Sequence, residues 1–347
     1  MIAVGSVGLG HMGLLHLRNT RFIEDIQVVA AADRSEKSLA EAGSYGVKNL
    51  YKDYHEMLKL DNLDAVIISL PNFLHEECIA LFAEKGVNIF VEKPLARTLS
   101  ECERIERVIK KSGSILCVGH NYRFFEHVRR LKEEHEKGTL GEVELANMEH
   151  FVNGPFAHPL EPRPVPDWWL NPELSGGGVL LDQGSHLIDL FRWFFPKPRL
   201  VYANLGYRYG LGLEDSAIIV LESQGSGTRG IISVGWFQKM IFPQFNFRVT
   251  LQGTTRFLST EDFAPKNMYY TAAKEALKNI VRKVFGKKIN VLSYTYYYTS
   301  YFKEIQLFFE SVKSGKYMGD VATIDDGLET VKVIEETYRR AGNSRKW

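Results

Sequence analysis

The chain has 347 residues, of which 45% are hydrophobic, so two hydrophobic cores and therefore two domains are expected. Its 43 basic and 42 acidic residues give a formal charge of +1, which provides no global field for binding nucleic acid or an anionic membrane. No apolar run reaches the roughly 20 residues that span a bilayer, and the first residues lack a secretory leader pattern. The three cysteines, Cys78, Cys102 and Cys117, are typical of reduced thiols. We expect a cytoplasmic protein with a small-molecule partner.

The first 120 residues alternate short apolar runs with amphipathic stretches. The apolar runs predict buried parallel strands at 2–7, 26–32, 65–70, 88–91 and 115–118. Helices are expected at 74–85 and 99–111, the second opened by a capping box of Ser100 and Glu103. This alternation predicts a doubly wound parallel α/β sheet of the Rossmann type in a first domain, residues 1–120.

A glycine-rich turn follows the first strand directly and opens the first helix. Gly8, Gly10 and Gly13 have the G-x-G-x-x-G spacing, with His11 and Met12 inside the motif. Glycines let the backbone approach a pyrophosphate, and the free amide groups of a helix start face its charge. The five residues are therefore expected to contact a dinucleotide.

An acidic residue ends the second strand, where a dinucleotide fold binds the adenosine ribose. Asp33 can accept hydrogen bonds from the ribose hydroxyls and would repel a 2′-phosphate, which favours NAD over NADP. The adjacent Arg34 can stack on adenine or tolerate the phosphate, so NADP stays possible.

Two further turns lie at the carboxyl edge of the predicted sheet, where the nicotinamide half should pass. The first holds Leu70, Pro71 and Asn72, with His75 following. A simple turn and helix cap is the alternative interpretation of these residues.

The second turn holds Glu92 and Lys93, followed by a proline that ends the strand. We expect both residues beside the cofactor. The Lys93 ammonium can bind a substrate oxygen and favour the alkoxide that forms as hydride leaves. A surface ion pair between Glu92 and Lys93 is the alternative.

After Gly119 the pattern changes to longer segments of alternating apolar and polar residues, which predicts a second domain, residues 121–347. A helix is expected at 125–137, and strands at 143–152, 200–207, 216–222, 228–237 and 245–251. They indicate an α+β domain with a large, open, mostly antiparallel sheet. Its second face can bind a partner subunit, so a homodimer or homotetramer is expected. A closing helix at 324–341 can pack back on the first domain.

Two segments fall outside this scheme. The proline-rich stretch 155–172 is interpreted as a long loop over the site. The basic amphipathic stretch 272–289 is either a solvated helix packed on the sheet or a contact for a substrate phosphate or a neighbouring subunit.

The most informative stretch of the second domain is 176–189. In a helix Asp182, His186 and Asp189 share one face, which would place the imidazole between carboxylates. Such partners would raise its basicity, as suits a general base. A hydrogen-bonded core helix and a metal site are the alternatives. No cysteine or second histidine has metal-ligand spacing, so no metal is expected.

Together these motifs resemble the glucose-fructose oxidoreductase and inositol dehydrogenase family, written Gfo/Idh/MocA. The resemblance rests on the following segments: Gly8-x-Gly10-x-x-Gly13, Glu92-Lys93-Pro94, Asn121-Tyr122-Arg123-Phe124 and Gly177-Gly178-x-x-x-Asp182-x-x-x-His186-x-x-Asp189. It implies a Rossmann domain, an open antiparallel sheet with helices on one face, and an active site between them. It also implies that His186 takes the hydroxyl proton, Asp182 orients it or the substrate, and Lys93 grips the reacting oxygen.

The same resemblance implies further substrate contacts after the domain junction and in the proline-rich loop. These candidates are Tyr122, Arg123, Arg163, Asp167, Trp168 and Asn171.

The expected activity is oxidation of a secondary alcohol of a sugar, inositol or sugar derivative by an NAD(P)-dependent dehydrogenase. One alternative is a sugar-nucleotide 3-dehydrogenase acting on a ligand such as a UDP-N-acetyl-hexosamine, with Arg163 or the basic stretch holding its phosphates. The other is a sensor or regulator that binds NAD(P) without catalysis.

Overall fold

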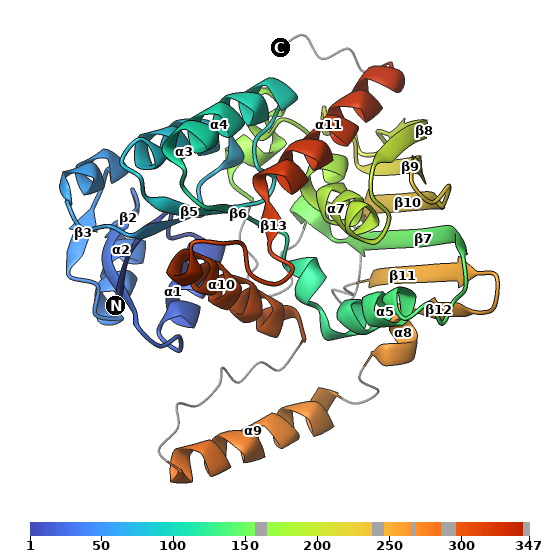
Figure 1. Ribbon diagram of the computed structural model, residues 1–347. Helices are drawn as coiled ribbons and strands as arrows, with labels where there is room; N and C mark the ends of the chain where they lie inside the picture. Colours follow the sequence, from blue (N-terminus) through green and yellow to red (C-terminus); the bar gives the residue numbers. More distant parts are fainter. Residues whose placement is uncertain (157–164, 238–245, 265–267, 286–295, 343–347) are drawn as a thin grey trace.

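The protein contains two β-sheets that lie side by side, each with its own helices (Figure 1). The computed structural model describes residues 1–156, 165–237, 246–264, 268–285 and 296–342. Arg163 and Phe245, the first residue of a predicted strand, lie outside these ranges.

The first sheet has seven strands in the order β13-β6-β5-β4-β1-β2-β3, all parallel except β13. The strands are β1 (Ile2–Val7), β2 (Ile26–Ala32), β3 (Asn49–Tyr51), β4 (Ala65–Ile68), β5 (Asn88–Glu92), β6 (Leu116–Gly119) and β13 (Ala322–Thr323). The central strands are buried throughout, as their continuous apolar runs predict. The order reverses next to β1, which places the expected ligand crevice at the end of that strand.

Helices cover both faces of this sheet (Figure 1). They are α1 (His11–Thr20), α2 (Glu36–Ser44), α3 (His75–Ala83), α4 (Leu99–Ser112) and α10 (Tyr296–Ser314). The predicted capping box of α4 is wrong by two residues: Thr98 and Glu101 form it, because the helix already begins at Leu99. A doubly wound α/β unit is thereby confirmed.

The second sheet has six strands in the order β12-β11-β7-β10-β9-β8, and only the β7–β10 pair is parallel. Its strands are β7 (Val143–Val152), β8 (Pro198–Gly206), β9 (Ser216–Ser223), β10 (Arg229–Trp236), β11 (Asn246–Gly253) and β12 (Phe257–Ser259). Its helices are α5 (Glu126–Glu136), α7 (Ser185–Phe194), α8 (Thr260–Phe263) and α11 (Ile324–Arg340).

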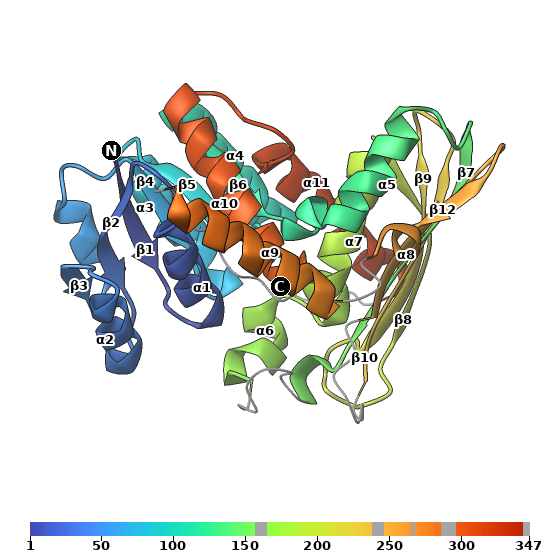
Figure 2. The same cartoon turned by 90° about the horizontal axis from the view of Figure 1, so that it is seen from below.

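These helices lie on one face of the second sheet, and the other face is uncovered (Figure 2). Residues alternate accordingly: Ile219 and Leu221 are buried, whereas Ile218 and Tyr202 are about half exposed. The open, mostly antiparallel sheet predicted from the alternation is thus confirmed.

The chain returns to the first sheet near its end. Ile305, Phe308 and Phe309 of α10 pack in the core beneath β1, β4 and β5, and β13 pairs with β6. Helix α11 then packs against both α4 and α7, so it contacts elements of both units. A boundary after residue 120 would therefore separate β13 from the rest of its sheet, and helix α10 from the sheet on which it packs.

Residues 272–284 of the basic stretch belong to helix α9 (Met268–Val284), which lies apart from both sheets at the lower side of the molecule in Figure 1. The expectation of a helix there is confirmed, but its packing on the sheet is not observed. Within the described ranges no helix is both long and apolar enough to cross a membrane.

Candidate active site

The glycine turn between β1 and α1 is close-packed on one side and open on the other. Gly8 has φ +81°, and a Cβ there would lie 2.5 Å from the Ser69 carbonyl oxygen. A Cβ on Gly13 would lie 1.8 Å from the Gly8 carbonyl oxygen, so helix and turn touch through backbone. A Cβ on Gly10 would meet no described atom within 4 Å, and no side chain in the described ranges caps α1. Because this start of α1 is open and its amides are uncapped, the turn fits a dinucleotide pyrophosphate.

Asp33 lies directly beside this turn. Its Oδ2 accepts a hydrogen bond from the Leu9 amide at 2.6 Å, and its Oδ1 accepts one from the Ser35 amide at 2.7 Å. These bonds fix the carboxylate at the end of β2, where a ribose hydroxyl can still donate to its remaining lone pairs. Arg34 is exposed next to it. The cofactor residues predicted in the first strand-helix-strand unit are therefore brought together.

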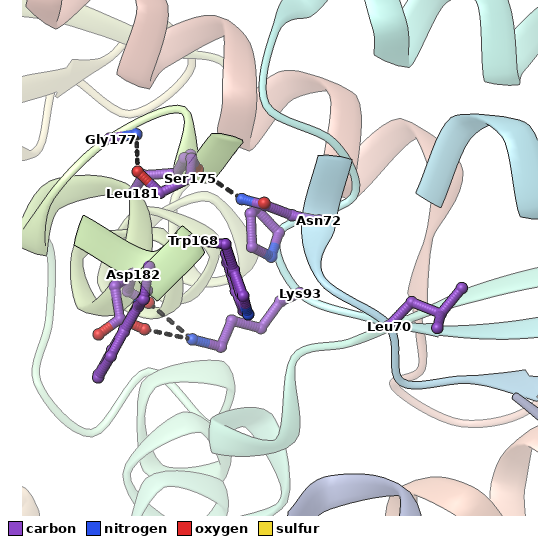
Figure 3. A pocket seen from close by; sticks show the side chains of 10 residues that line it. Leu70, Asn72, Lys93, Trp168, Ser175, Gly177, Leu181 and Asp182 are labelled. Carbon is purple, nitrogen blue, oxygen red and sulfur yellow. Dashed lines mark hydrogen bonds and ion pairs between the residues drawn. The ribbon is translucent and has the colours of Figure 1, made fainter. Parts of the chain in front are cut away.

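The turn after β4 lines a pocket at the carboxyl edge of the sheet (Figure 3). Leu70 and Asn72 contribute to its wall, and the Asn72 side chain donates to the Ser175 carbonyl oxygen at 2.6 Å. His75 has a different place. It is buried, with Nδ1 3.0 Å from the Pro94 carbonyl oxygen and Nε2 2.9 Å from that of Leu70. Its imidazole holds the two turns together rather than lining the pocket.

Glu92 and Lys93 do not pair with each other. Glu92 is buried, and its Oε1 is 2.7 Å from Nε2 of His16, which lies on α1. His16 was not predicted as a site residue, although its position on the helix that follows the glycine turn points to the same crevice. The interpretation as a surface ion pair is therefore wrong.

The Lys93 ammonium instead reaches across to the second unit (Figure 3). Its Nζ donates to the Asp182 carbonyl oxygen at 2.8 Å and to Asp182 Oδ1 at 3.0 Å. Both side chains are largely buried, with exposed fractions of 16% for Lys93 and 14% for Asp182. This contact joins the front and back halves of the chain at one wall of the pocket.

Asp182 lies on a single π-helical turn, Leu180–Gly184, that precedes α7. Such turns are rare and occur frequently at functional sites. Glu214 anchors its start: Glu214 Oε1 accepts hydrogen bonds from the Gly178 and Leu180 amides and from the Tyr338 hydroxyl of α11. The closing helix thereby supports the turn that positions Asp182.

A polar network extends from Asp182 into the second sheet. Asp182 Oδ2 accepts from the Gln183 side chain, whose Oε1 is 2.9 Å from Nε2 of His150. The same His150 nitrogen is 2.9 Å from the Tyr122 hydroxyl. Burial lowers the pKa of His150 to about 4, so this imidazole is neutral near pH 7. Gln183 and His150 were not predicted, although alternation along β7 places His150 on its buried side.

His186 lies in the first turn of α7 and stacks on the Tyr122 ring, with 3.9 Å between centroids and an interplanar angle of 5°. Its expected placement between two carboxylates is wrong. Asp182 pairs with Lys93, Asp189 pairs with Arg123, and His186 Nδ1 has no hydrogen-bond partner among the residues that the structure describes. Burial, followed by the Lys93 cation, lowers the pKa of His186 well below its ordinary value. The imidazole is therefore neutral near pH 7, and the ammonium lies close enough to influence it.

Two other predicted substrate residues, Trp168 and Arg123, have different places in the structure. Trp168 lines the pocket and contacts Phe73 edge-on, with centroids 6.1 Å apart. Arg123 is buried and bound by the carboxylates of Asp189 and Asp326, at 2.5 and 3.1 Å. Since its guanidinium is used by these two acids, the structure gives Arg123 a role in the core rather than in the pocket.

Asp167 and Asn171 lie at the two ends of the segment that holds Trp168: Asp167 begins the short helical turn Asp167–Leu170, and Asn171 follows it directly. Asn171 caps α6 (Pro172–Ser175) through a hydrogen bond from the Glu173 amide, which is a structural role. Among the residues that the structure describes, no group of His, Cys, Asp or Glu could hold a metal ion. The cysteines are free and buried.

Comparison with known proteins defines the class of this fold and site. Residues 2–120 match the model of an oxidoreductase family with an NAD-binding Rossmann fold. Residues 128–258 match the model of the GFO/IDH/MocA C-terminal domain. The protein is thus an oxidoreductase with an NAD-binding domain.

The chain belongs to the GFO/IDH/MocA family. It is 28% identical to myo-inositol 2-dehydrogenase of Thermotoga maritima over 90% of this chain and 89% of that protein. A probable dehydrogenase of Thermotoga maritima has the same fold, with a TM-score of 0.77, 24% identity, and 99% and 98% of the two chains covered. So does scyllo-inositol dehydrogenase of Lactobacillus casei with bound NAD(H) and scyllo-inositol, with a TM-score of 0.75, 20% identity, and 98% and 96% covered.

Proposed function

We propose that this oxidoreductase oxidises a secondary alcohol of a sugar, an inositol or a related polyol and transfers the hydride to NAD. One observation carries the proposal: the Lys93 ammonium is hydrogen-bonded to Asp182 in the pocket at the edge of the sheet where a nicotinamide ring would lie, and its charge helps to lower the pKa of His186. A cation and a neutral imidazole suit alcohol oxidation, because the cation can stabilise the developing alkoxide while the imidazole accepts the hydroxyl proton.

Each residue has a separate role in the proposed reaction. Lys93 holds the reacting oxygen with its ammonium, and Asp182 keeps that ammonium in place through two hydrogen bonds. His186 accepts the hydroxyl proton, and stacking on Tyr122 fixes the plane of its ring. Bound nicotinamide supplies the hydride acceptor.

The remaining contacts follow from the same arrangement. Tyr122 and Trp168 are proposed to contact the substrate. The cofactor would lie over Gly10 and between Asp33 and Lys93. The Asp33 carboxylate favours NAD, with NADP as the second possibility. The names of the relatives, which include inositol dehydrogenases, support a cyclic polyol as the substrate class.

We further propose a cytoplasmic homodimer or homotetramer. The uncovered face of the second sheet supports this assembly, because it exposes Val201, Tyr202 and Ile218 together on neighbouring strands.

The test is formation of NADH from NAD by the purified protein with a panel of inositols, sugars and nucleotide-linked sugars. Turnover with at least one free polyol or sugar is expected. Turnover confined to nucleotide-linked sugars would favour the sugar-nucleotide dehydrogenase instead. Binding of NAD without turnover on the whole panel would favour a regulator and contradict the proposal.

A further inference from the structure

Helix α9 presents its apolar side to solvent. Leu277, Ile280, Val281 and Val284 lie at helical spacings of three, four and seven residues and therefore share one face. Their exposed fractions are 64%, 60%, 51% and 75%, and Phe285, which follows the helix, is 72% exposed. We name these five residues the α9 stripe. Water-soluble helices normally bury such a face, so this arrangement is inverted.

The opposite side of α9 is polar and faces the protein. Asn279 is only 6% exposed, and Arg282 is partly buried. The polar side of the helix is thus the covered side, and the α9 stripe is exposed to solvent. Helix α9 itself lies at the lower side of the molecule in Figure 1. Contiguous exposed apolar residues of this kind mark a surface that another partner covers.

Positive charge borders the α9 stripe. The stretch 272–288 contains only one acidic residue, Glu275, whereas its basic residues are Lys274, Lys278, Arg282, Lys283, Lys287 and Lys288. Lys274 and Lys283 are exposed on α9, and helical spacing places them on opposite flanks of the stripe. Since the whole chain has a formal charge of only +1, positive charge is concentrated here.

We propose that α9 lies on the surface of a membrane rich in anionic lipids, with the α9 stripe in the interfacial layer and the flanking lysines on the lipid phosphates. An apolar face bordered by lysine and arginine is the composition that binds such an interface. Self-association through α9 is disfavoured, because two copies of the helix would bring like charges together.

This docking differs from membrane spanning. The sequence-based expectation that no membrane is involved rested on the absence of a long apolar run and on the low net charge, and neither excludes an interfacial helix. The uncovered face of the second sheet points away from α9 in Figure 2. An oligomer formed through that sheet would therefore leave the α9 stripe accessible.

The test is flotation of the full chain with vesicles of phosphatidylcholine alone or of phosphatidylcholine with about one third phosphatidylglycerol. Binding to the anionic vesicles is expected, with weak binding to the neutral ones and a decrease in high salt. The double variant Ile280→Asp, Val284→Asp should lose vesicle binding. The double variant Lys274→Glu, Lys283→Glu should weaken it at least about 30-fold, from roughly 1 kcal/mol for each cation.

Matched controls change the same residue types elsewhere. Phe257→Asp removes an apolar side chain that is 69% exposed on β12, and Lys85→Glu reverses an exposed lysine after α3. Both should bind vesicles like the unaltered protein. Absence of binding to anionic vesicles, or equal binding to neutral ones, would overturn the proposal. So would loss of a dimer, rather than of vesicle binding, in the Ile280→Asp, Val284→Asp variant, since a second copy would then cover the stripe.

Discussion

Replacing Lys93 by methionine removes the cation from the proposed reaction centre and keeps most of the side-chain volume. The ammonium makes two hydrogen bonds to Asp182, at 2.8 and 3.0 Å, so it is already positioned when substrate arrives. Loss of one such preorganised donor costs about 3 kcal/mol of transition-state stabilisation, or roughly 100- to 1000-fold in kcat/KM. NAD affinity should fall much less than turnover, because the residues proposed to bind the pyrophosphate and the ribose, Gly10 and Asp33, are untouched.

The same variant changes the pH dependence. His186 must be neutral to accept a proton, so activity falls as pH decreases through its pKa. Burial is the largest cause that lowers this pKa, and the Lys93 cation is the second. Without the cation the pKa rises toward its ordinary value, so the acid limb of kcat/KM should move to higher pH in Lys93→Met.

Stability must be separated from catalysis in this experiment. Lys93→Met leaves the largely buried Asp182 carboxylate without its cation, which costs up to about 3 kcal/mol of unfolding free energy. Adding Asp182→Asn removes the unpaired charge, so the double variant should recover stability but not turnover. Initial rates of NADH formation between pH 5 and 9 provide the assay. A loss smaller than tenfold, or an acid limb that does not move, would refute the assigned role of Lys93.

Four further substitutions test other parts of the structure. Gly10→Ala should fold normally yet weaken NAD binding at least tenfold, as measured by calorimetric titration. Gly13→Ala should instead reduce stability in thermal unfolding, because its Cβ meets backbone atoms whereas a Cβ on Gly10 does not. Asp33→Ser should raise the ratio of NADP to NAD activity, measured as kcat/KM, and an unchanged ratio would remove Asp33 from cofactor selection. Arg123→Leu should lower the unfolding free energy by about 3–5 kcal/mol in urea titration, because Asp189 would stay buried without its cation. A loss below about 1 kcal/mol would contradict the stabilising role of the buried Arg123–Asp189 pair.

The local features of the first domain could be predicted because they depend on short-range chemistry. The strand at 2–7, the glycine turn and Asp33 all follow from residue types within one strand-helix-strand unit. The capping box was misplaced because Thr98 and Ser100 are both acceptable caps, and only the packed helix start distinguishes them.

The partners of the charged residues could not be predicted in this way. Helical spacing predicts Asp182, His186 and Asp189 on one face, but Asp182 lies on the π-helical turn before α7 and is bound by Lys93, which is 89 positions earlier in the chain. Arg123 likewise forms an ion pair with Asp189, which the spacing had assigned to His186. Sequence spacing reports which side chains share a face, whereas competition from distant cations decides which of them pair.

Transfer of deuterium tests the proposed function most directly. A polyol that supports NADH formation would be deuterated at its reacting carbon and incubated with the protein and NAD, and the reduced cofactor would be isolated. The arrangement of Lys93 and His186 predicts deuterium on the nicotinamide ring and a rate loss of at least 100-fold in Lys93→Met. Deuterium released to water, or equal transfer by the variant, would contradict direct hydride transfer at this site.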